Sequence, residues 1–206
     1  MLQGKTAIVT GGSKGIGFAI AKELASQGVT VIICSRTERE LKMAVKKLSS
    51  TKRKVFGQVT DVSRFTDCQK LSDYAYFLTG RIDILVNNAG IFGPVGLLET
   101  NDPEAWKDVM AINILGAVYC SMLVIPYMKK QGYGKIINLA GAGVGSSKSL
   151  PRFSAYYTSK TAVVNFTECL AAELQPDNIQ VNAIAPGAIA SELTLSLLKL
   201  DKSQVG

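Results

Sequence analysis

The chain has 206 residues, of which 47% are hydrophobic, and a formal net charge of +7 at pH 7. This length and composition suit one domain with a substantial core, and no linker, repeat or low-complexity run divides it, so we expect a single domain over residues 1–206. Histidine is absent, which excludes a catalytic triad or a metal centre built on imidazole, and we expect no bound metal.

The cysteines are scattered and include no C-x-x-C pair: Cys34, Cys68, Cys120 and Cys169. This usage is typical of buried free thiols in an intracellular protein rather than of a disulfide framework. The first residues show no signal-peptide pattern. We therefore predict a cytoplasmic protein.

Apolar runs alternate with helical patterns along the chain, and the second helix is announced by a capping box, Thr37-Glu38-Arg39-Glu40. Several runs are continuous, which is typical of parallel strands covered on both faces. The predicted fold class is α/β, a Rossmann-like doubly wound parallel sheet in three α/β/α layers with strand order 3-2-1-4-5-6. The predicted strands are 6–10, 29–35, 54–59, 82–87, 134–140 and 179–185.

A glycine-rich turn joins the first strand to the first helix and has the spacing G-x-x-x-G-x-G. Such a turn presents backbone N–H groups at a helix N-terminus, where the helix dipole favours a phosphate. The residues expected to hold that phosphate are Gly11, Ser13, Lys14, Gly15, Ile16 and Gly17.

Basic residues gather after the second strand. Lys42, Lys46 and Lys47 lie on the polar side of an amphipathic helix, and three more basic residues follow at 52–54. A solvated helix face explains this cluster, and a nucleic-acid surface is the other interpretation. Because no aromatic residues lie among the lysines, we expect no nucleic-acid partner.

The segment 103–131 is a long apolar helix pattern. Val109 to Met128 is apolar apart from Asn113 and Ser121, which is long enough to span a membrane. A helix start signal, Asp102-Pro103-Glu104, opens the segment. We favour a helix buried between the sheet and a partner subunit and expect no membrane.

Two further motifs complete the pattern: Asn87-Asn88-Ala89-Gly90 after the fourth strand and Tyr156-x-x-x-Lys160 in a later helical pattern. With the glycine turn, they resemble the short-chain dehydrogenase/reductase family from about residue 4 to about residue 193. The resemblance implies an oxidoreductase that moves a hydride between a nicotinamide dinucleotide and a small carbonyl or alcohol. Family members usually continue further, so it also predicts a shortened C-terminus that lacks the usual last strand and leaves 179–185 as an edge.

The end of the second strand favours NADP(H) over NAD(H). Where the family's Asp would bond the ribose 2′-hydroxyl, this chain has Ser35, followed by Arg36. Arg36 and Lys14 suit a 2′-phosphate, because charged donors bind a dianion strongly. The alternative is that both cations are ordinary solvated surface residues.

The resemblance places the remaining cofactor contacts, and it implies that Asn87 braces the sheet. The Pro-Gly segment is also explained simply as the turn that ends a strand. The implied contacts are Asp61, Val62, Asn88, Ala89, Gly90, Tyr156, Lys160, Pro186, Gly187, Ile189 and Ser191.

Tyr156 and Lys160 share one helix face if the helix begins by Tyr156. A nearby ammonium lowers the pKa of a phenol, so we predict that Tyr156 donates a proton to a carbonyl and accepts one in the reverse oxidation. The resemblance adds Asn113 as the residue that holds a water leading to Lys160. It also implies that Lys160 bonds the nicotinamide ribose.

One position departs from the family pattern. Where the family has a serine that orients the substrate carbonyl, this chain has Ala140 and Gly141. Ser146 or Ser147 in the following loop is a candidate replacement. Losing one such hydrogen bond costs a factor of about 10²–10³ in rate. The alternative function is therefore a non-catalytic NADP(H)-binding scaffold or sensor. In either case we expect a homodimer formed through helices 103–131 and 156–175.

Overall fold

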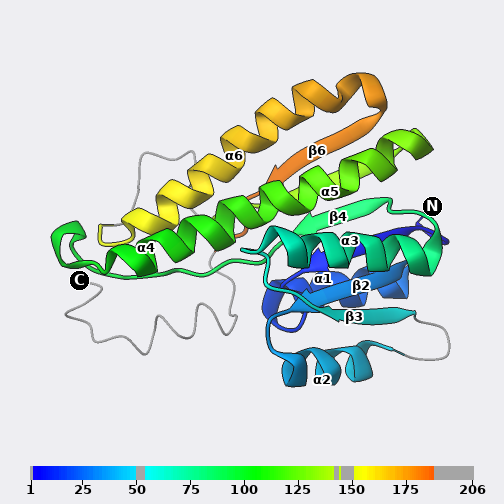
Figure 1. The fold of residues 1–206 in the computed structure, drawn as a ribbon, viewed down its shortest axis with the longest axis horizontal. Helices are drawn as coiled ribbons and strands as arrows, with labels where there is room; N and C mark the ends of the chain where they lie inside the picture. The colour runs from blue at the N-terminus through cyan, green and yellow to red at the C-terminus, as the bar shows by residue number, and fades with distance from the viewer. Residues whose placement is uncertain (1, 50–53, 142–143, 145–150, 188–206) are drawn as a thin grey trace.

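A computed structural model describes residues 2–49, 54–141, 144 and 151–187. Six parallel strands form one sheet in the order β3-β2-β1-β4-β5-β6, which confirms the predicted order (Figure 1). Each observed strand lies within its predicted range, and the ends differ by at most two residues. The strands are β1 (Thr6–Thr10), β2 (Thr30–Ser35), β3 (Val55–Val59), β4 (Ile84–Asn87), β5 (Gly134–Leu139) and β6 (Ile179–Ile184).

Helices cover both faces of this sheet, as the alternating pattern predicts. Figure 1 shows α3, α5 and α6 across the near face. The helices are α1 (Gly15–Ser26), α2 (Glu38–Leu48), α3 (Phe65–Thr79), α4 (Pro103–Met110), α5 (Gly116–Gln131) and α6 (Ser154–Leu174). Short 3₁₀ turns lie at η1 (Leu98–Thr100) and η3 (Gln175–Asp177).

The core divides into two apolar layers because successive strand residues point to opposite faces. In β1, Ala7 and Val9 pack with α1 and α2, whereas Ile8 packs with α3, α5 and α6. The continuous apolar runs of the inner strands follow from this double coverage.

The predicted helix 103–131 is continuous but contains one irregular turn. α4 and α5 are joined by a π-helical turn, η2 (Ala111–Leu115), and Asn113 lies within it. Single π turns inside α-helices are frequent at functional sites. By length and composition, this helix (Pro103–Gln131) is the one candidate membrane span among the described residues, with mean hydropathy 2.0 and 39% of that window buried. Its inward residues, among them Val124 and Met128, belong to the core.

Two local predictions were wrong. Thr37 occupies the N-cap of α2, but its side chain makes no capping hydrogen bond. Cys169 is exposed on α6, whereas the other three cysteines are buried free thiols.

A buried carboxylate ties the other end of the sheet together. Asp83 precedes β4, and its side chain is fully buried. It accepts hydrogen bonds from Thr6 N at 2.9 Å, Lys5 Nζ at 3.1 Å and Arg81 Nε at 2.7 Å. This cluster joins the starts of β1 and β4, far along the strands from their carboxyl ends.

Candidate active site

The glycine turn before α1 needs glycine at four positions, one of which is Gly12, where a Cβ would lie 2.7 Å from Ile33 Cβ. Gly11 and Gly15 have φ of +62° and +56°, in the left-handed region that favours glycine. At Gly17, a Cβ would collide with the carbonyl oxygen of Gly11 and with Nδ2 of Asn88. These residues therefore bring the turn, the helix and the segment after β4 into close contact.

The N-terminus of α1 fits an anion. Lys14 is the N-cap residue, with extended backbone, and no side chain caps the helix. The first helical bond runs from Phe18 N to Lys14 O at 3.2 Å, so the N–H groups of Gly15, Ile16 and Gly17 precede the helical ladder. No acidic residue lies in the first turn. The donors present thus suit a dinucleotide phosphate.

Thr10, at the end of β1, holds the loop after β4, and the sequence analysis missed it. Its Oγ1 accepts hydrogen bonds from Asn88 N and Ala89 N, both at 3.0 Å. In return, Asn88 Nδ2 donates to Thr10 O at 2.8 Å and to Gly11 O at 3.2 Å. The only signal in the sequence was a threonine next to the first glycine of the turn.

Asn87 braces the sheet, as the resemblance implied. Its Nδ2 donates to Asn138 Oδ1 at 2.8 Å and to Ser121 Oγ at 3.2 Å. Asn138 Nδ2 in turn donates to Thr167 Oγ1 at 2.9 Å. This buried polar chain links β4, β5 and α6 just below the carboxyl ends of the strands.

Near the end of β2, Lys14 forms an ion pair with Glu40 that the sequence analysis missed. Ser35 Oγ accepts a hydrogen bond from Thr37 N at 3.2 Å, and Arg36 is exposed. Lys14 Nζ lies 3.8 Å from Glu40 Oε2, and both side chains are about half exposed. An acidic side chain from α2 therefore stands beside one of the two cations expected to meet a 2′-phosphate.

Asp61 and Val62 follow β3 in a tight turn. Asp61 Oδ1 accepts hydrogen bonds from Ser63 N at 3.0 Å and Ser63 Oγ at 2.7 Å. Val62 is buried and packs so closely on Gly116 that a Cβ there would lie 2.8 Å from Val62 Cγ2. These contacts fix the conformation of the turn, and its contact with adenine stays a prediction.

Asn113 clamps the segment after β4. Its Oδ1 accepts a hydrogen bond from Ile91 N at 2.8 Å, and its Nδ2 donates to Ile91 O at 2.9 Å and to Ser159 Oγ at 2.9 Å. Gly90 lies beside it, and a Cβ there would approach Asn113 Oδ1 at 3.2 Å and Lys160 Nζ at 3.3 Å. The structure thus gives Gly90 a reason independent of any ligand, which is room for these two side chains.

Tyr156 and Lys160 lie in the first two turns of α6, so the condition for a shared face is met. Lys160 is 5% exposed, and its Nζ donates to Leu139 O at 2.7 Å. Burial lowers the pKa of Lys160 to about 8. Burial, and next the charge of Tyr157, raise the pKa of Tyr156 above its ordinary value, so the expected lowering by Lys160 is not found.

Aromatic rings surround the Tyr156 phenol. Phe92 packs against it with ring centroids 4.7 Å apart, and Tyr157 packs edge to face at 5.7 Å. Phe153 also packs against Phe92, with ring centroids 6.2 Å apart. At Gly141, a Cβ would lie 2.9 Å from Tyr156 Oη. The position without the family's serine therefore adjoins the tyrosine hydroxyl directly.

Other predicted residues are only partly placed. Pro186 and Gly187 follow β6 at the same edge of the sheet. Ile189, Ser191, Ser146 and Ser147 lie outside the described residues. Within the described ranges, no group of three or more Cys, Asp or Glu side chains is arranged to hold a metal.

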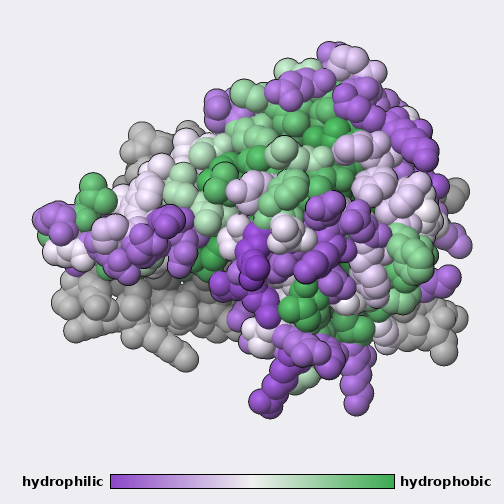
Figure 2. Space-filling view, viewed as in Figure 1, coloured by the Kyte–Doolittle hydropathy of each residue, from purple (hydrophilic) through white to green (hydrophobic). Residues whose placement is uncertain are grey.

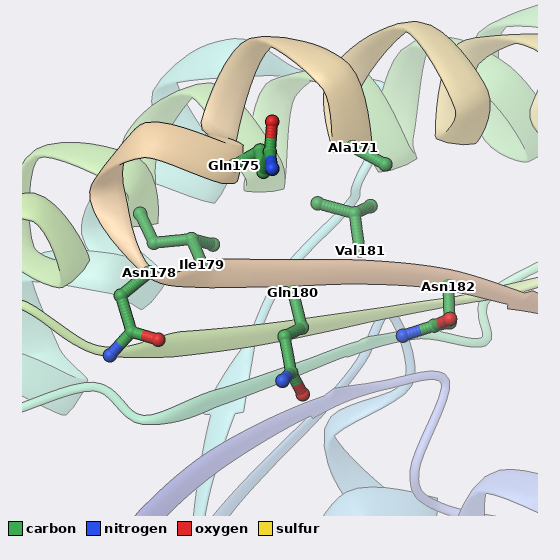
Figure 3. A pocket seen from close by; sticks show the side chains of 7 residues that line it. All are labelled: Ala171, Gln175, Asn178, Ile179, Gln180, Val181 and Asn182. Carbon is green, nitrogen blue, oxygen red and sulfur yellow. The ribbon is translucent and has the colours of Figure 1, made fainter.

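One cavity lies outside the candidate active site. A cavity of about 550 Å³ lies between the end of α6 and β6, lined by Ala171, Gln175, Asn178, Ile179, Gln180, Val181 and Asn182 (Figure 3). Ile179 begins β6, so the cavity sits toward the opposite end of that strand from Gly141 and Tyr156.

The fold, with a glycine turn and a Tyr–Lys pair at the carboxyl ends of its strands, defines a dinucleotide-binding α/β protein. The chain belongs to the short chain dehydrogenase family, whose sequence model matches residues 5–200.

Relatives and solved structures agree with this assignment. Dehydrogenase/reductase SDR family member 4 from Pongo abelii is 37% identical over 203 residues, covering 98% of this chain and 72% of that protein. The Caenorhabditis elegans protein of the same name is 38% identical, covering 93% of this chain and 74% of its own length. Among solved structures, NAD+-bound xylitol dehydrogenase has a TM-score of 0.92 at 31% identity and covers 100% of this chain and 78% of that chain. A 3-ketoacyl-(acyl-carrier-protein) reductase from Brucella melitensis, complexed with NADH, has a TM-score of 0.89 at 30% identity, covering 95% and 80%.

Proposed function

We propose that this chain is an NADP(H)-dependent oxidoreductase that interconverts a small carbonyl and an alcohol, with Tyr156 as proton donor and acceptor. One observation carries the proposal. Tyr156 and Lys160 converge on Gly141, where a Cβ would meet Tyr156 Oη at 2.9 Å and Lys160 Cγ at 3.2 Å. Asn113 Oδ1 and Lys160 Nζ also lie together beside Gly90, where a Cβ would approach them at 3.2 and 3.3 Å.

A nicotinamide dinucleotide, when bound, would donate or accept the hydride, and this chain's residues would donate or accept the proton. The raised pKa of Tyr156 keeps its phenol protonated near neutral pH, which is the form that donates to a carbonyl oxygen. Lys160, with a pKa of about 8, stays largely cationic at pH 7 and stabilises the phenolate left after proton transfer. Asn113 fixes the loop that carries Ile91 beside this pair.

Lys14 and Arg36 support the choice of NADP(H). Lys14 lies in the glycine turn and Arg36 follows the end of β2. In this fold, the adenosine ribose of a dinucleotide lies near these two places. Glu40 weakens the positive field, because its carboxylate stands 3.8 Å from Lys14 Nζ. The preference proposed here is therefore for NADP(H), with NAD(H) still accepted.

The test is a fluorescence titration of the purified chain with NADPH and, in parallel, NADH, followed by a panel of ketones and aldehydes. We expect saturable binding that favours NADPH and slow turnover with some carbonyl. Tyr156→Phe should still bind NADPH saturably and lose turnover. Retained turnover in that variant would remove Tyr156 from the proposed role.

A non-catalytic NADP(H)-binding scaffold or sensor is the second candidate, and one observation favours it. No hydroxyl stands at Ala140 or Gly141, so the donor that would orient a carbonyl is missing there. This candidate predicts tight NADPH binding, no turnover with any carbonyl, and no change in binding or cellular role on Tyr156→Phe. Turnover abolished by Tyr156→Phe would contradict it.

We also propose a cytoplasmic homodimer that pairs the long helices. Leu115 and Met122 are 40% and 56% exposed, and Figure 2 shows hydrophobic colour gathered over α5 and α6. Partly buried Tyr119, Leu123 and Ile125 lie along the same helix. An exposed apolar strip of this kind is typical of a covered interface. Sedimentation of the wild type and Met122→Asp distinguishes the dimer from a monomer.

A further inference from the structure

The phenol of Tyr156 adjoins both an aromatic ring and a backbone segment. The Phe92 ring lies at a centroid distance of 4.7 Å with the two planes tilted by 50°. Gly141 lies so close that a Cβ there would approach Tyr156 Oη at 2.9 Å and Cε1 at 3.0 Å. The phenol therefore fills space that any side chain at position 141 would need.

We propose that Phe92 is a positioning residue for Tyr156, because its ring holds the phenol against the backbone of Gly141 where no serine stands to orient the reacting groups. The inference rests on the proposed role of Tyr156 in proton transfer. It assigns to this chain a hydrophobic clamp at the place where a hydroxyl is missing.

The backbone on both sides of Phe92 is itself fixed. Ile91 is bonded through both its N–H and its carbonyl to Asn113, at 2.8 and 2.9 Å. Gly93 has φ +75°, and a Cβ there would collide with Val109. Figure 1 shows this loop running alongside α4. A ring placed between two such anchors has little freedom to leave the phenol.

Phe153 is a second aromatic neighbour of the Phe92 ring. It is 5% exposed, and its ring meets that of Phe92 edge to face at 6.2 Å. Edge-to-face contact is a favoured arrangement of aromatic pairs. Phe92 therefore packs on Phe153 and Tyr156 together, and its loss would free the phenol to move by a rotamer.

Displacement of the Tyr156 phenol would slow proton transfer more than it would weaken the binding of substrate or cofactor. A shift of about 1 Å in a catalytic group costs as much as about 10²-fold in rate. The donors proposed for the cofactor phosphates lie in the glycine turn and the first turn of α1, and Phe92 is not among the proposed cofactor contacts, so the affinity for NADPH should change little. The predicted signature is a lower kcat with similar KM and cofactor affinity.

The experiment compares Phe92→Leu, which removes the ring, with Phe92→Tyr, which keeps it. Phe92→Met serves as a second ring-less variant if Phe92→Leu is poorly folded. Phe65→Leu is the matched control, because it breaks a ring pair with Tyr119 (5.5 Å) elsewhere. The chain contains 7 tyrosines, so 3-fluorotyrosine labelling gives a resolvable ¹⁹F NMR spectrum. Tyr156→Phe identifies the resonance of Tyr156.

We expect Phe92→Leu to shift or broaden the Tyr156 resonance and to lower kcat by about 10- to 100-fold. KM and the NADPH dissociation constant should stay within twofold, and Phe92→Tyr should restore both readouts. An unchanged resonance and kcat in Phe92→Leu would overturn the inference. So would an effect confined to KM, since the ring would then only line a substrate surface.

The two proposals fail in different ways. If the wild type turns over no carbonyl, the proposed function fails, and the Tyr156 resonance still reports whether Phe92 positions the phenol. If the wild type turns over a carbonyl but the Tyr156 resonance is unchanged in Phe92→Leu, only the positioning role fails. Equal shifts in Phe65→Leu would also count against the clamp, because the effect would not be local.

Discussion

Asn113 and Ser159 are joined by a buried hydrogen bond of 2.9 Å between the π turn and α6. Ser159 has no exposed surface, and its hydroxyl donates to Tyr156 O at 2.7 Å while it accepts from Asn113 Nδ2. One hydroxyl thus connects the loop clamp at Ile91 with the backbone of Tyr156. The irregular turn places Asn113 where this link is possible.

Ser159→Ala should destabilise the fold by about 1–3 kcal/mol and lower kcat. Asn113 Nδ2 would keep only Ile91 O, and a buried donor that loses a partner carries most of its desolvation cost. Urea unfolding and steady-state kinetics measure the two effects. Ser72→Ala is the control, because Ser72 is also buried but makes only a local bond to Gln69 O at 2.9 Å. Equal losses in both variants would argue against a special role for Ser159.

Gly141→Ser should turn over faster than Gly141→Ala. Both variants add a Cβ that would lie 2.9 Å from Tyr156 Oη and must push this hydroxyl away. The steric strain is therefore the same in both variants. Only the serine adds a donor for a developing oxyanion, which is worth a factor of about 10²–10³ in favourable geometry. We expect the serine variant to exceed the alanine variant by about tenfold in kcat. Equal rates would mean that no substrate oxygen approaches position 141.

Glu40→Gln should strengthen NADPH binding and leave NADH binding unchanged. The substitution frees Lys14 from its 3.8 Å ion pair and removes a negative charge near the expected 2′-phosphate. Because exposed pairs are worth little, the gain should be about two- to fivefold. Glu38→Gln is the control, since Glu38 pairs with Lys42 at 2.7 Å. A matching gain for NADH would show that Glu40 does not discriminate between the cofactors.

The elements of the fold could be predicted because their signals are local. Continuous apolar runs specify parallel strands, and the glycine spacing specifies the turn before α1. The spacing of Tyr156 and Lys160 likewise places them on one face of α6.

Contacts between distant segments could not be predicted in the same way. Nothing near Glu40 in the sequence indicates Lys14, and nothing near Phe92 indicates Tyr156, because each pair meets only after the sheet is assembled. The pKa of Tyr156 is the clearest case. The i,i+4 spacing predicted a lowered value, but Lys160 Nζ donates to Leu139 O and burial raises the pKa instead.

Tyr157→Phe should move the rise of oxidative activity to lower pH. In the proposed mechanism, oxidation of an alcohol needs the Tyr156 phenolate, so its rate should increase as pH rises toward the pKa of Tyr156. Burial is the main cause of the raised pKa, and the charge of Tyr157 adds to it. The variant keeps the ring that lies 5.7 Å away but cannot ionise. A pH profile of kcat in the oxidative direction tests this, and a shift to higher pH would contradict it.

Asp83→Asn should cost about 2–4 kcal/mol of stability at pH 7, because it removes the buried negative charge that pairs with Lys5 and Arg81. Burial raises the pKa of Asp83, but hydrogen bonds from Arg81, Thr6 and Lys5 outweigh it and hold the pKa below 3.8. A lowered folded-state pKa contributes stability above the unfolded value of about 3.9 and loses it as pH falls through the folded value. The wild type should therefore lose this advantage over Asp83→Asn as the solution is acidified below about pH 4.

Urea unfolding at pH 7 and at successive acid steps measures this difference in stability. Asp73→Asn is the matched control, because Asp73 accepts one exposed bond from Tyr127 at 3.0 Å. It should cost no more than about 0.5 kcal/mol at any pH. A gap between wild type and Asp83→Asn that stays constant down to pH 3 would mean that the Asp83 carboxylate does not set the acid stability of this sheet.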